Sequence, residues 1–224
     1  MRDRTWQVRV GAHEVTAAFD AAATNERCPA FVFAHGAGGH MADRGVLALA
    51  ARLRARGLHV VRFNFPYSQR HSRRPDAMPL LQACIAAVAS RAADEIDAER
   101  WLLGGRSMGG RAASMLVADG YACDTLLLLA YPLHPAGKPE ALRDAHLARI
   151  ATPVLCFNGT RDPFCTPELM KRVLERVTTP WEMLWLDGAD HSFHVLKSSG
   201  KTDAQVMTEV ADAAEKWVAR VRSS

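Results

Sequence analysis

"GGRSMGG", residues 104–110, places four glycines around one serine. Inside a helix or strand, each glycine destabilises by roughly 0.5–1 kcal/mol relative to alanine, so a cluster indicates backbone angles or close approaches that a Cβ forbids. The apolar stretch "RWLL" precedes the segment, and the small-residue helical pattern "RAASMLVADG" follows it. We therefore predict a sharp turn that leads from a strand directly into a helix.

The turn contains the pattern G-x-S-x-G, formed by Gly105, Ser107 and Gly109. This pattern is typical of a nucleophile elbow, in which strained angles expose the serine hydroxyl and only very small side chains fit two residues before and after it. The helix that begins there directs its free amides and its positive dipole end toward the serine. A phosphate-binding loop is disfavoured, because Arg111 and Ala112 stand where that loop needs a lysine and a hydroxyl.

Strand signals appear throughout the chain. Short apolar runs alternate with helical patterns from about residue 30 onward, which predicts an α/β fold with a mainly parallel sheet and helices on both faces. Two opening strands, 7–10 and 14–19, are expected to form a hairpin around Gly11. Six later strands are nearly continuous apolar runs, typical of strands buried on both sides; they begin at Ala30, His59, Arg100, Asp124, Pro153 and Trp181. The prediction is one domain, residues 1–224, with an eight-stranded sheet.

Helix signals lie between these strands. Gly57 is expected to cap the C-terminus of a helix at 46–56, and Thr166 to cap the N-terminus of a helix that reaches Val177. Apolar residues at helical spacing over 206–221 predict a closing helix.

Composition excludes several classes of protein. Of 224 residues, 49% are apolar and 23% charged, which suits a globular core. No apolar run approaches the roughly 20 residues of a membrane span, and the N-terminal segment lacks a signal-peptide pattern, so we expect a cytoplasmic protein without a membrane partner. The five scattered cysteines lack metal-site or redox spacing and are expected to be reduced, with no metal bound.

The net charge of +4 is small, and its main local run is "RHSRRP" at 70–75. No aromatic residues interleave with these arginines and no nucleic-acid-binding motif is visible, so nucleic acid is not an expected partner. Nothing in the sequence predicts an oligomeric state.

A serine hydroxyl is a poor nucleophile until a base accepts its proton, so Ser107 requires a histidine and an orienting acid. Asp162, in "NGTRDPF", follows one predicted strand, and His191, in "DGADHSFH", follows the next. Successive parallel strands end at the same edge of a sheet, so loops far apart in sequence can meet there. We therefore predict that Ser107, Asp162 and His191 converge as a catalytic triad.

Each assignment has an alternative. His194 competes with His191, although it lies where the chain moves on from the last strand. Asp187 and Asp190 compete with Asp162 as the orienting acid, although their closeness in sequence to His191 makes the geometry awkward. Asp162 itself has a structural interpretation, as a loop aspartate that accepts hydrogen bonds from nearby amides.

Attack on an acyl carbon places negative charge on oxygen, which needs preorganised donors. The segment "HGAGG", residues 35–39, follows the strand from Ala30, where the second donor of an oxyanion hole is expected. We predict that the backbone amides of Met108 and Ala37 form this hole, with Gly36 or Gly38 as alternatives. A simple glycine-rich turn is the structural interpretation of the same segment.

Four segments in order, "HGAGG", "GRSMGG", "GTRDPF" and "ADHSF", make the chain resemble the α/β-hydrolase superfamily over nearly its whole length. "RFNFPY" and "YPLHPAGKPEALRDAHL" resemble a small dienelactone-hydrolase-like branch of it. Dienelactone hydrolases proper carry a cysteine nucleophile where this chain has Ser107. The resemblance therefore does not imply that a dienelactone is the substrate. Some eukaryotic relatives in the branch are described as subunits of chromatin complexes.

The motifs and the resemblance together imply a serine hydrolase that needs no cofactor and acts on small-molecule acyl substrates. An ester or thioester is the expected substrate, cleaved through an acyl-enzyme intermediate, with amide hydrolysis as a weaker variant. The alternative function is a noncatalytic protein-interaction member of the same fold.

The connection between the strands that begin at Asp124 and Pro153 has room for one brief helix, around 140–148. Many relatives insert a helical lid at this point. A minimal lid predicts an open cleft, which favours small or protruding esters over long acyl chains.

Several further residues are candidates for substrate binding. Arg70, Arg73 and Arg74 follow the strand that begins at His59, so we expect them at the same sheet edge as the elbow. With Arg106 and Arg111, they are candidates to attract a carboxylate-bearing substrate. The competing interpretation is a solvated loop. The other candidates at the border of the cleft, with packing in a loop as the alternative, are Gly36, Gly38, His134 and Lys138.

Overall fold

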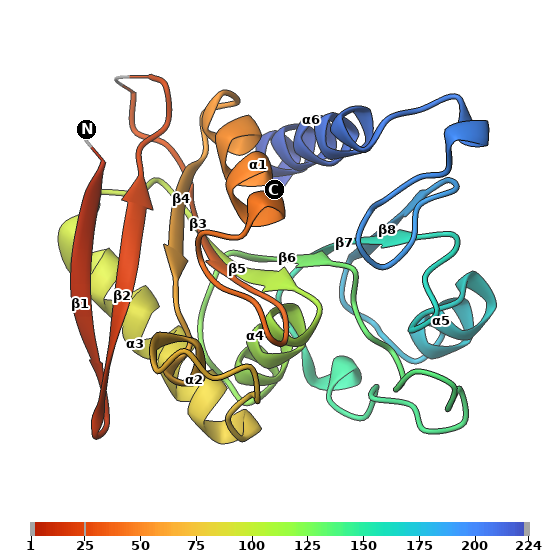
Figure 1. The fold of residues 1–224 in the computed structure, drawn as a ribbon, viewed down its shortest axis with the longest axis horizontal. Coiled ribbons are helices and arrows are strands. Elements are labelled where there is room, and N and C mark those ends of the chain that lie inside the picture. Colours follow the sequence, from red (N-terminus) through yellow and green to blue (C-terminus); the bar gives the residue numbers. More distant parts are fainter. Residues whose placement is uncertain (1–2, 25, 222–224) are drawn as a thin grey trace.

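The structure is a computed structural model that describes residues 3–24 and 26–221. Within these residues, eight strands form one sheet in the order β1-β2-β4-β3-β5-β6-β7-β8 (Figure 1). The predicted eight-stranded sheet is therefore confirmed. The strands are β1 Arg4–Val10, β2 His13–Asp20, β3 Ala30–Ala34, β4 His59–Phe63, β5 Trp101–Arg106, β6 Thr125–Leu129, β7 Val154–Gly159 and β8 Trp181–Leu186.

The sheet is antiparallel at its start and parallel elsewhere. β1 and β2 form the predicted hairpin, with Val8 opposite Val15 and Gly11 in the turn at φ 58°. β2 also pairs antiparallel with β4. From β4 to β8 every pairing is parallel, so the carboxyl ends of these strands share one edge.

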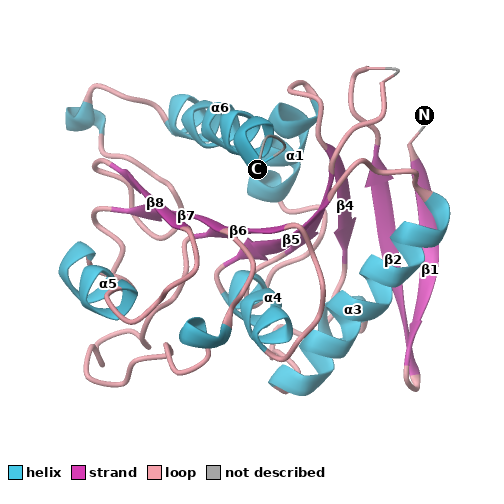
Figure 2. Ribbon diagram, turned by 180° about the vertical axis from the view of Figure 1, so that it is seen from behind, coloured by secondary structure: helices cyan, strands magenta, loops and turns pink. Residues whose placement is uncertain are grey.

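Helices cover both faces of the sheet, as predicted. Helices α1 and α6 lie on one face, and α3, α4 and α5 lie on the other (Figure 2). None of the helices in the described part of the chain is long and apolar enough to cross a bilayer. The helices are α1 Arg44–Arg54, α2 Pro66–Gln69, α3 Met78–Glu95, α4 Met108–Ala118, α5 Pro167–Leu174 and α6 Asp203–Val221, with 3₁₀ turns η1 Leu147–Arg149 and η2 Lys197–Ser199.

Strand β3 shows how the central strands are buried on both sides. Phe31 and Phe33 pack in the apolar cluster under α1 and α6, whereas Val32 and Ala34 belong to the cluster under α3 and α4. Complete burial of a large apolar side chain stabilises a fold by roughly 1.5–3 kcal/mol. The central strands are thereby fixed in register, and with them the loops at their carboxyl ends.

Two predicted helix caps are present in the structure, and one predicted helix end is not. Gly57, at φ 80°, follows α1, and the Thr166 hydroxyl accepts a hydrogen bond from the Leu169 amide at 3.3 Å. The prediction that this helix reaches Val177 is wrong, because α5 ends at Leu174. Val177 instead donates to the Leu174 carbonyl in a turn and packs against the core from there.

The connection from β6 to β7 carries no α-helix. The expected helix at 140–148 is replaced by the three-residue turn η1. The Arg143 amide donates to the Leu133 carbonyl at 2.7 Å, and the Arg143 carbonyl accepts from the Tyr131 hydroxyl at 3.0 Å. These bonds across the loop use backbone groups that a helix would need, so the carboxyl edge of the sheet has no helical lid from this segment.

Candidate active site

Ser107 occupies the sharp turn between β5 and α4. Its backbone angles are φ 50° and ψ −117°, a conformation that residues with a side chain rarely adopt and that persists only where the surroundings enforce it. The Ser107 amide donates to the Leu129 carbonyl at 2.8 Å, and the Ser107 carbonyl accepts from the Arg111 amide at 2.9 Å. The strained turn predicted from the glycines is present.

The two glycines of the elbow are required by strand β3. A Cβ on Gly105 would lie 2.1 Å from the Ala34 carbonyl oxygen, and one on Gly109 would lie 2.5 Å from the His35 carbonyl oxygen. In a tight elbow, the residues two before and two after the serine are expected to approach each other, which would explain the need for Gly105 and Gly109. The structure corrects this, because the close neighbour of both is the end of β3, which packs directly against the elbow.

Three side chains from separate loops form one hydrogen-bonded chain. Ser107 Oγ lies 2.8 Å from His191 Nε2, and His191 Nδ1 lies 2.8 Å from Asp162 Oδ2. The Asp162 side chain is fully buried, whereas His191 is 19% exposed. Asp162 follows β7 and His191 follows β8, so the shared carboxyl edge of the parallel strands brings them to the elbow.

The Asp162 carboxylate is surrounded by donors. Besides His191, Asn158 Nδ2 donates to Oδ2 at 3.1 Å and the Phe164 amide donates to Oδ1 at 2.8 Å. These donors compensate for the water that the buried carboxylate has lost. Asn158 is itself fixed by Tyr131, whose amide and carbonyl both bond to the asparagine side chain. The sequence analysis missed Asn158, although a polar residue at the end of an apolar strand was an available signal.

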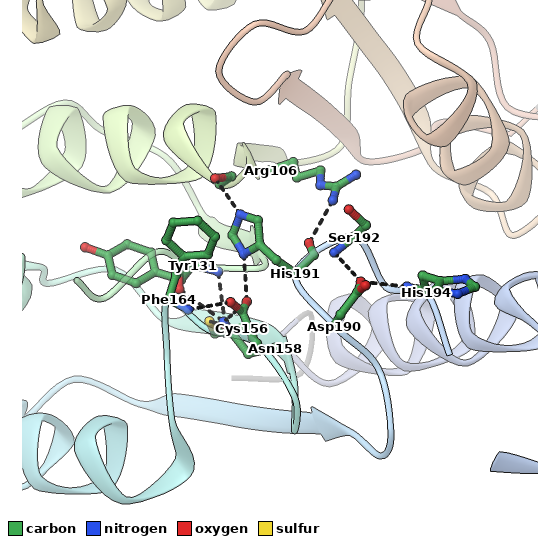
Figure 3. A network of polar contacts seen from close by, with 11 residues as sticks. Arg106, Tyr131, Cys156, Asn158, Phe164, Asp190, His191, Ser192 and His194 are labelled. Carbon is green, nitrogen blue, oxygen red and sulfur yellow. Dashed lines mark hydrogen bonds and ion pairs between the residues drawn. The ribbon is translucent and has the colours of Figure 1, made fainter. Parts of the chain in front are cut away.

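Two neighbours restrict the His191 loop (Figure 3). The Phe164 ring lies 4.4 Å from the His191 ring, centroid to centroid. Arg106 donates from its guanidinium to the His191 carbonyl at 2.7 Å and lies over the Phe193 ring at 6.0 Å. Burial lowers the pKa of Arg106, and the nearby Asp190 carboxylate opposes this shift.

The alternative acid and base candidates lie elsewhere. His194 is exposed and points away from His191 (Figure 3), with Nδ1 2.9 Å from Asp203 Oδ2. The bond to Asp203 raises the pKa of His194. Asp190 accepts hydrogen bonds from the Ser192 and His194 amides, which shape the loop. The structure thus joins Asp162 and His191 to the elbow and places these alternatives outside the chain of contacts.

Two backbone amides beside the elbow have no hydrogen-bond acceptor among the described residues. Ala37 and Met108 both line the cleft beside Ser107, and among the described residues no group accepts a hydrogen bond from either amide. Met108 is the first residue of α4, where helix geometry leaves the amide free. Gly36 also lines the cleft, and Gly38 does not.

His35 holds the loop that carries Ala37. Its Nε2 accepts from the Phe65 amide at 3.2 Å, so Nδ1 carries the proton and donates to the Gly36 carbonyl at 2.9 Å. Burial lowers the pKa of His35 to about 4, which keeps the ring neutral near pH 7. The Tyr67 hydroxyl donates to the same Gly36 carbonyl at 3.1 Å. The position of the Ala37 amide is therefore fixed by buried groups.

The cleft above Ser107 has a volume of about 550 Å³. Its lining includes Arg106 and Arg111 of the predicted candidates, and also Arg143 and Phe164, which the sequence analysis missed. Both Arg143 and Phe164 lie in irregular loops, for which apolar patterns give no signal. The described residues contain no cluster of three or more His, Cys, Asp or Glu side chains suited to a metal, and no disulfide.

Apart from Gly36, the other predicted binding residues lie outside the lining. Arg73 and Arg74 are exposed in their loop, and Arg70 pairs with Asp76 at 2.8 Å. His134 is only 3% exposed, and its Nδ1 lies 2.8 Å from the Pro135 carbonyl oxygen.

Comparisons with known proteins agree on the fold. A family model described as an alpha/beta hydrolase domain matches residues 27–219. An alpha-beta serine hydrolase homologue from Coxiella burnetii is 20% identical over 96% of this chain and 97% of its own, with a TM-score of 0.76. Dienelactone hydrolase from Anabaena variabilis is 19% identical over 98% and 97%, with a TM-score of 0.75. XC6422 from Xanthomonas campestris, a serine hydrolase without lid, is 21% identical over 96% and 94%, with a TM-score of 0.75.

Proposed function

Because the chain belongs to the α/β-hydrolase family, as its motifs predicted, we propose that this hydrolase cleaves carboxylic esters or thioesters through an acyl-enzyme intermediate. The observation that carries the proposal is the chain of two 2.8 Å contacts from Ser107 through His191 to Asp162 at the base of an open cleft. Serine hydrolases among its structural neighbours agree with this assignment.

Acylation begins when His191 Nε2 accepts the Ser107 proton while Ser107 Oγ attacks the substrate carbonyl. Asp162 holds the proton on His191 Nδ1, which leaves Nε2 free as the base and stabilises the imidazolium that forms. The Ala37 and Met108 amides donate to the oxygen as it gains negative charge. His191 then gives its proton to the leaving oxygen or sulfur, and the ester bond breaks.

Deacylation repeats these steps with water. His191 takes a proton from the water, whose oxygen attacks the acyl carbon, and the Ser107 oxygen leaves as the proton returns to it. General acid–base transfer of this kind contributes roughly 10²- to 10⁴-fold to a rate. The residues involved need no cofactor for this cycle, and we propose that one domain carries it out in the cytoplasm.

The cleft favours compact acyl groups. No α-helix from the β6–β7 connection covers it, so a long acyl chain would gain little buried apolar contact. We therefore propose small or protruding esters as substrates.

A panel of p-nitrophenyl esters of increasing chain length, with a thioester and an anilide, tests the proposal. The wild type should hydrolyse the short esters faster than the long ones. Ser107→Ala should hydrolyse none of them, and His191→Ala should lose far more activity than His194→Ala. A folded wild type without activity on any member would favour the alternative, a noncatalytic protein-interaction role. A strong preference for long chains would contradict the open-cleft argument.

A further inference from the structure

Two arginines share the cleft with the proposed nucleophile. Arg111 lies in the first turn of α4, and its amide donates to the Ser107 carbonyl at 2.9 Å. Residues four apart on a helix lie on the same face, so Arg111 is one turn from Ser107. Arg143 comes from the β6–β7 connection and lines the same cleft. Two arginines from different elements thus line one cavity.

Among the described residues, no carboxylate neutralises either guanidinium. Arg111 Nε is buried without a hydrogen-bond partner. Within the described part of the chain, no carboxylate forms an ion pair with Arg111 or Arg143. Burial, followed by the nearby charge of Arg111, lowers the pKa of Arg143. Two neighbouring cations with an unsatisfied buried donor are unfavourable by themselves, and an anion between them would relieve both effects.

Other arginines of the chain show the contrast. The buried Arg62 guanidinium pairs with the Asp20 carboxylate, and Arg106 donates to the His191 carbonyl. Among the described residues that line the cleft, Asp43 is the one with a carboxylate side chain. This carboxylate accepts a hydrogen bond from the His40 amide at 2.9 Å. The lining therefore carries an excess of positive charge.

A buried hydrogen-bond network holds the two arginine-bearing segments together. The Ser114 hydroxyl donates to the Arg111 carbonyl at 2.8 Å, and the Tyr131 hydroxyl donates to the Arg143 carbonyl at 3.0 Å. Both hydroxyl oxygens lie near His146 Nε2, at 2.8 and 3.3 Å. His146 Nε2 is therefore within hydrogen-bond distance of both hydroxyl groups. One histidine thereby fixes both backbones, and the pair of arginines is preorganised.

We propose that Arg111 and Arg143 bind a carboxylate carried by the substrate, so that the site selects anionic esters. This inference rests on the proposed function. A guanidinium matches a carboxylate in planar, bidentate geometry, and charge-assisted bonds of this kind are about twice as strong as neutral ones. The carboxylate can belong to the acyl part or to the leaving group, and the test has one arm for each.

The first arm uses three p-nitrophenyl esters of matched length: the monoester of adipic acid, its methyl ester and the 6-aminohexanoate ester. The second arm compares 4-acetoxybenzoate with its methyl ester, which places the charge on the leaving group. In at least one arm, kcat/KM should be highest for the ester that carries the carboxylate. In the first arm, kcat/KM should be lowest for the ammonium ester. Arg111→Gln or Arg143→Gln should lower kcat/KM for the preferred anionic ester by roughly 10- to 100-fold and leave that of the neutral ester within about threefold.

Arg91→Gln is the matched control, because Arg91 is a surface residue of α3 that pairs with Glu95 outside the cleft. It removes the same charge and should leave the preference unchanged. Arg143→Lys should retain part of it. If Arg111→Gln does not fold, as judged by circular dichroism, Arg143→Gln and Arg111→Lys carry the test.

Labelling with a fluorophosphonate probe separates the two proposals. If the wild type and the arginine variants are labelled at Ser107 but no carboxylate preference exists in either arm, the inference about the substrate is wrong and the proposed function stands. A preference that survives in both glutamine variants would also overturn it. If the folded wild type is not labelled, both proposals fail.

Discussion

The Arg106 guanidinium donates a hydrogen bond of 2.7 Å to the carbonyl oxygen of His191, the residue whose imidazole reaches Ser107. The contact links the last residue of β5 to the loop after β8. It therefore connects the strand that carries the proposed nucleophile to the loop that carries the proposed base.

Arg106→Met should loosen this loop. Removal of the contact widens the range of positions that His191 samples, and a misplaced base lowers the rate of proton transfer. We expect kcat on a neutral ester to fall by roughly tenfold with KM nearly unchanged. Steady-state kinetics check this, with Arg106→Lys expected to recover part of the rate. A variant that raises KM alone would show that Arg106 contacts the substrate instead.

Asp162→Asn should abolish most activity and preserve the fold. An asparagine cannot hold the proton on His191 Nδ1, so the proton moves to Nε2, which can then no longer act as the base. A loss of roughly 10³- to 10⁴-fold in kcat is expected. Asp187→Asn is the matched control, since Asp187 is exposed and contacts Thr160 Oγ1 at 3.5 Å. Equal losses in the two variants would count against Asp162 as the orienting acid.

Gly109→Ala should destabilise the protein. The new Cβ would lie 2.5 Å from the His35 carbonyl oxygen, so β3 must move away from the elbow. Overpacking of this kind lowers the free energy of unfolding by roughly 1–3 kcal/mol. Urea unfolding measures the effect. Gly45→Ala is the comparison, because its Cβ would meet nothing nearer than 3.7 Å, and it should change stability by less than about 1 kcal/mol.

Stability should fall as pH decreases from about 6.5 to about 4. Burial is the main cause that lowers the pKa of His35 and of His146 to about 4. In the unfolded chain a histidine titrates near 6.5, so in this window the unfolded state binds more protons than the folded state. The free energy of unfolding therefore has its full value above about pH 6.5. It decreases below this pH by up to roughly 3 kcal/mol per histidine.

Urea unfolding between pH 7.5 and pH 4.5 measures this slope. His146→Gln removes one of the two groups, so its free energy of unfolding should depend less steeply on pH than that of the wild type. A stability that is constant or rises as pH falls through this window would contradict the assignment of neutral, buried histidines.

The sequence predicted those features that depend on regular strands. Each of Ser107, Asp162 and His191 follows a strand with a clear apolar pattern, and parallel strands deliver their loops to one edge, so the convergence of the three was predictable. The glycines of the elbow indicated close backbone approach, but the approaching strand, which ends at Ala34, could be identified only in three dimensions.

Features that depend on loop conformation were not predictable. Arg143 reaches the cleft because its backbone bonds to Leu133 and Tyr131 rather than forming the expected helix. Conversely, the loop that carries Arg73 follows a strand at the correct edge, yet its arginines do not line the cleft. Position at an edge is encoded by apolar periodicity, whereas the direction of a long side chain is set by local contacts.

The proposed function requires Ser107 to be a nucleophile that His191 activates. The most direct measurement is peptide mass spectrometry of the protein after exposure to a fluorophosphonate probe. We expect one adduct, on the peptide that contains Ser107. It should be absent from Ser107→Ala, form much more slowly in His191→Ala and be retained in His194→Ala. A folded wild type without an adduct, or with the adduct on another residue, would contradict it.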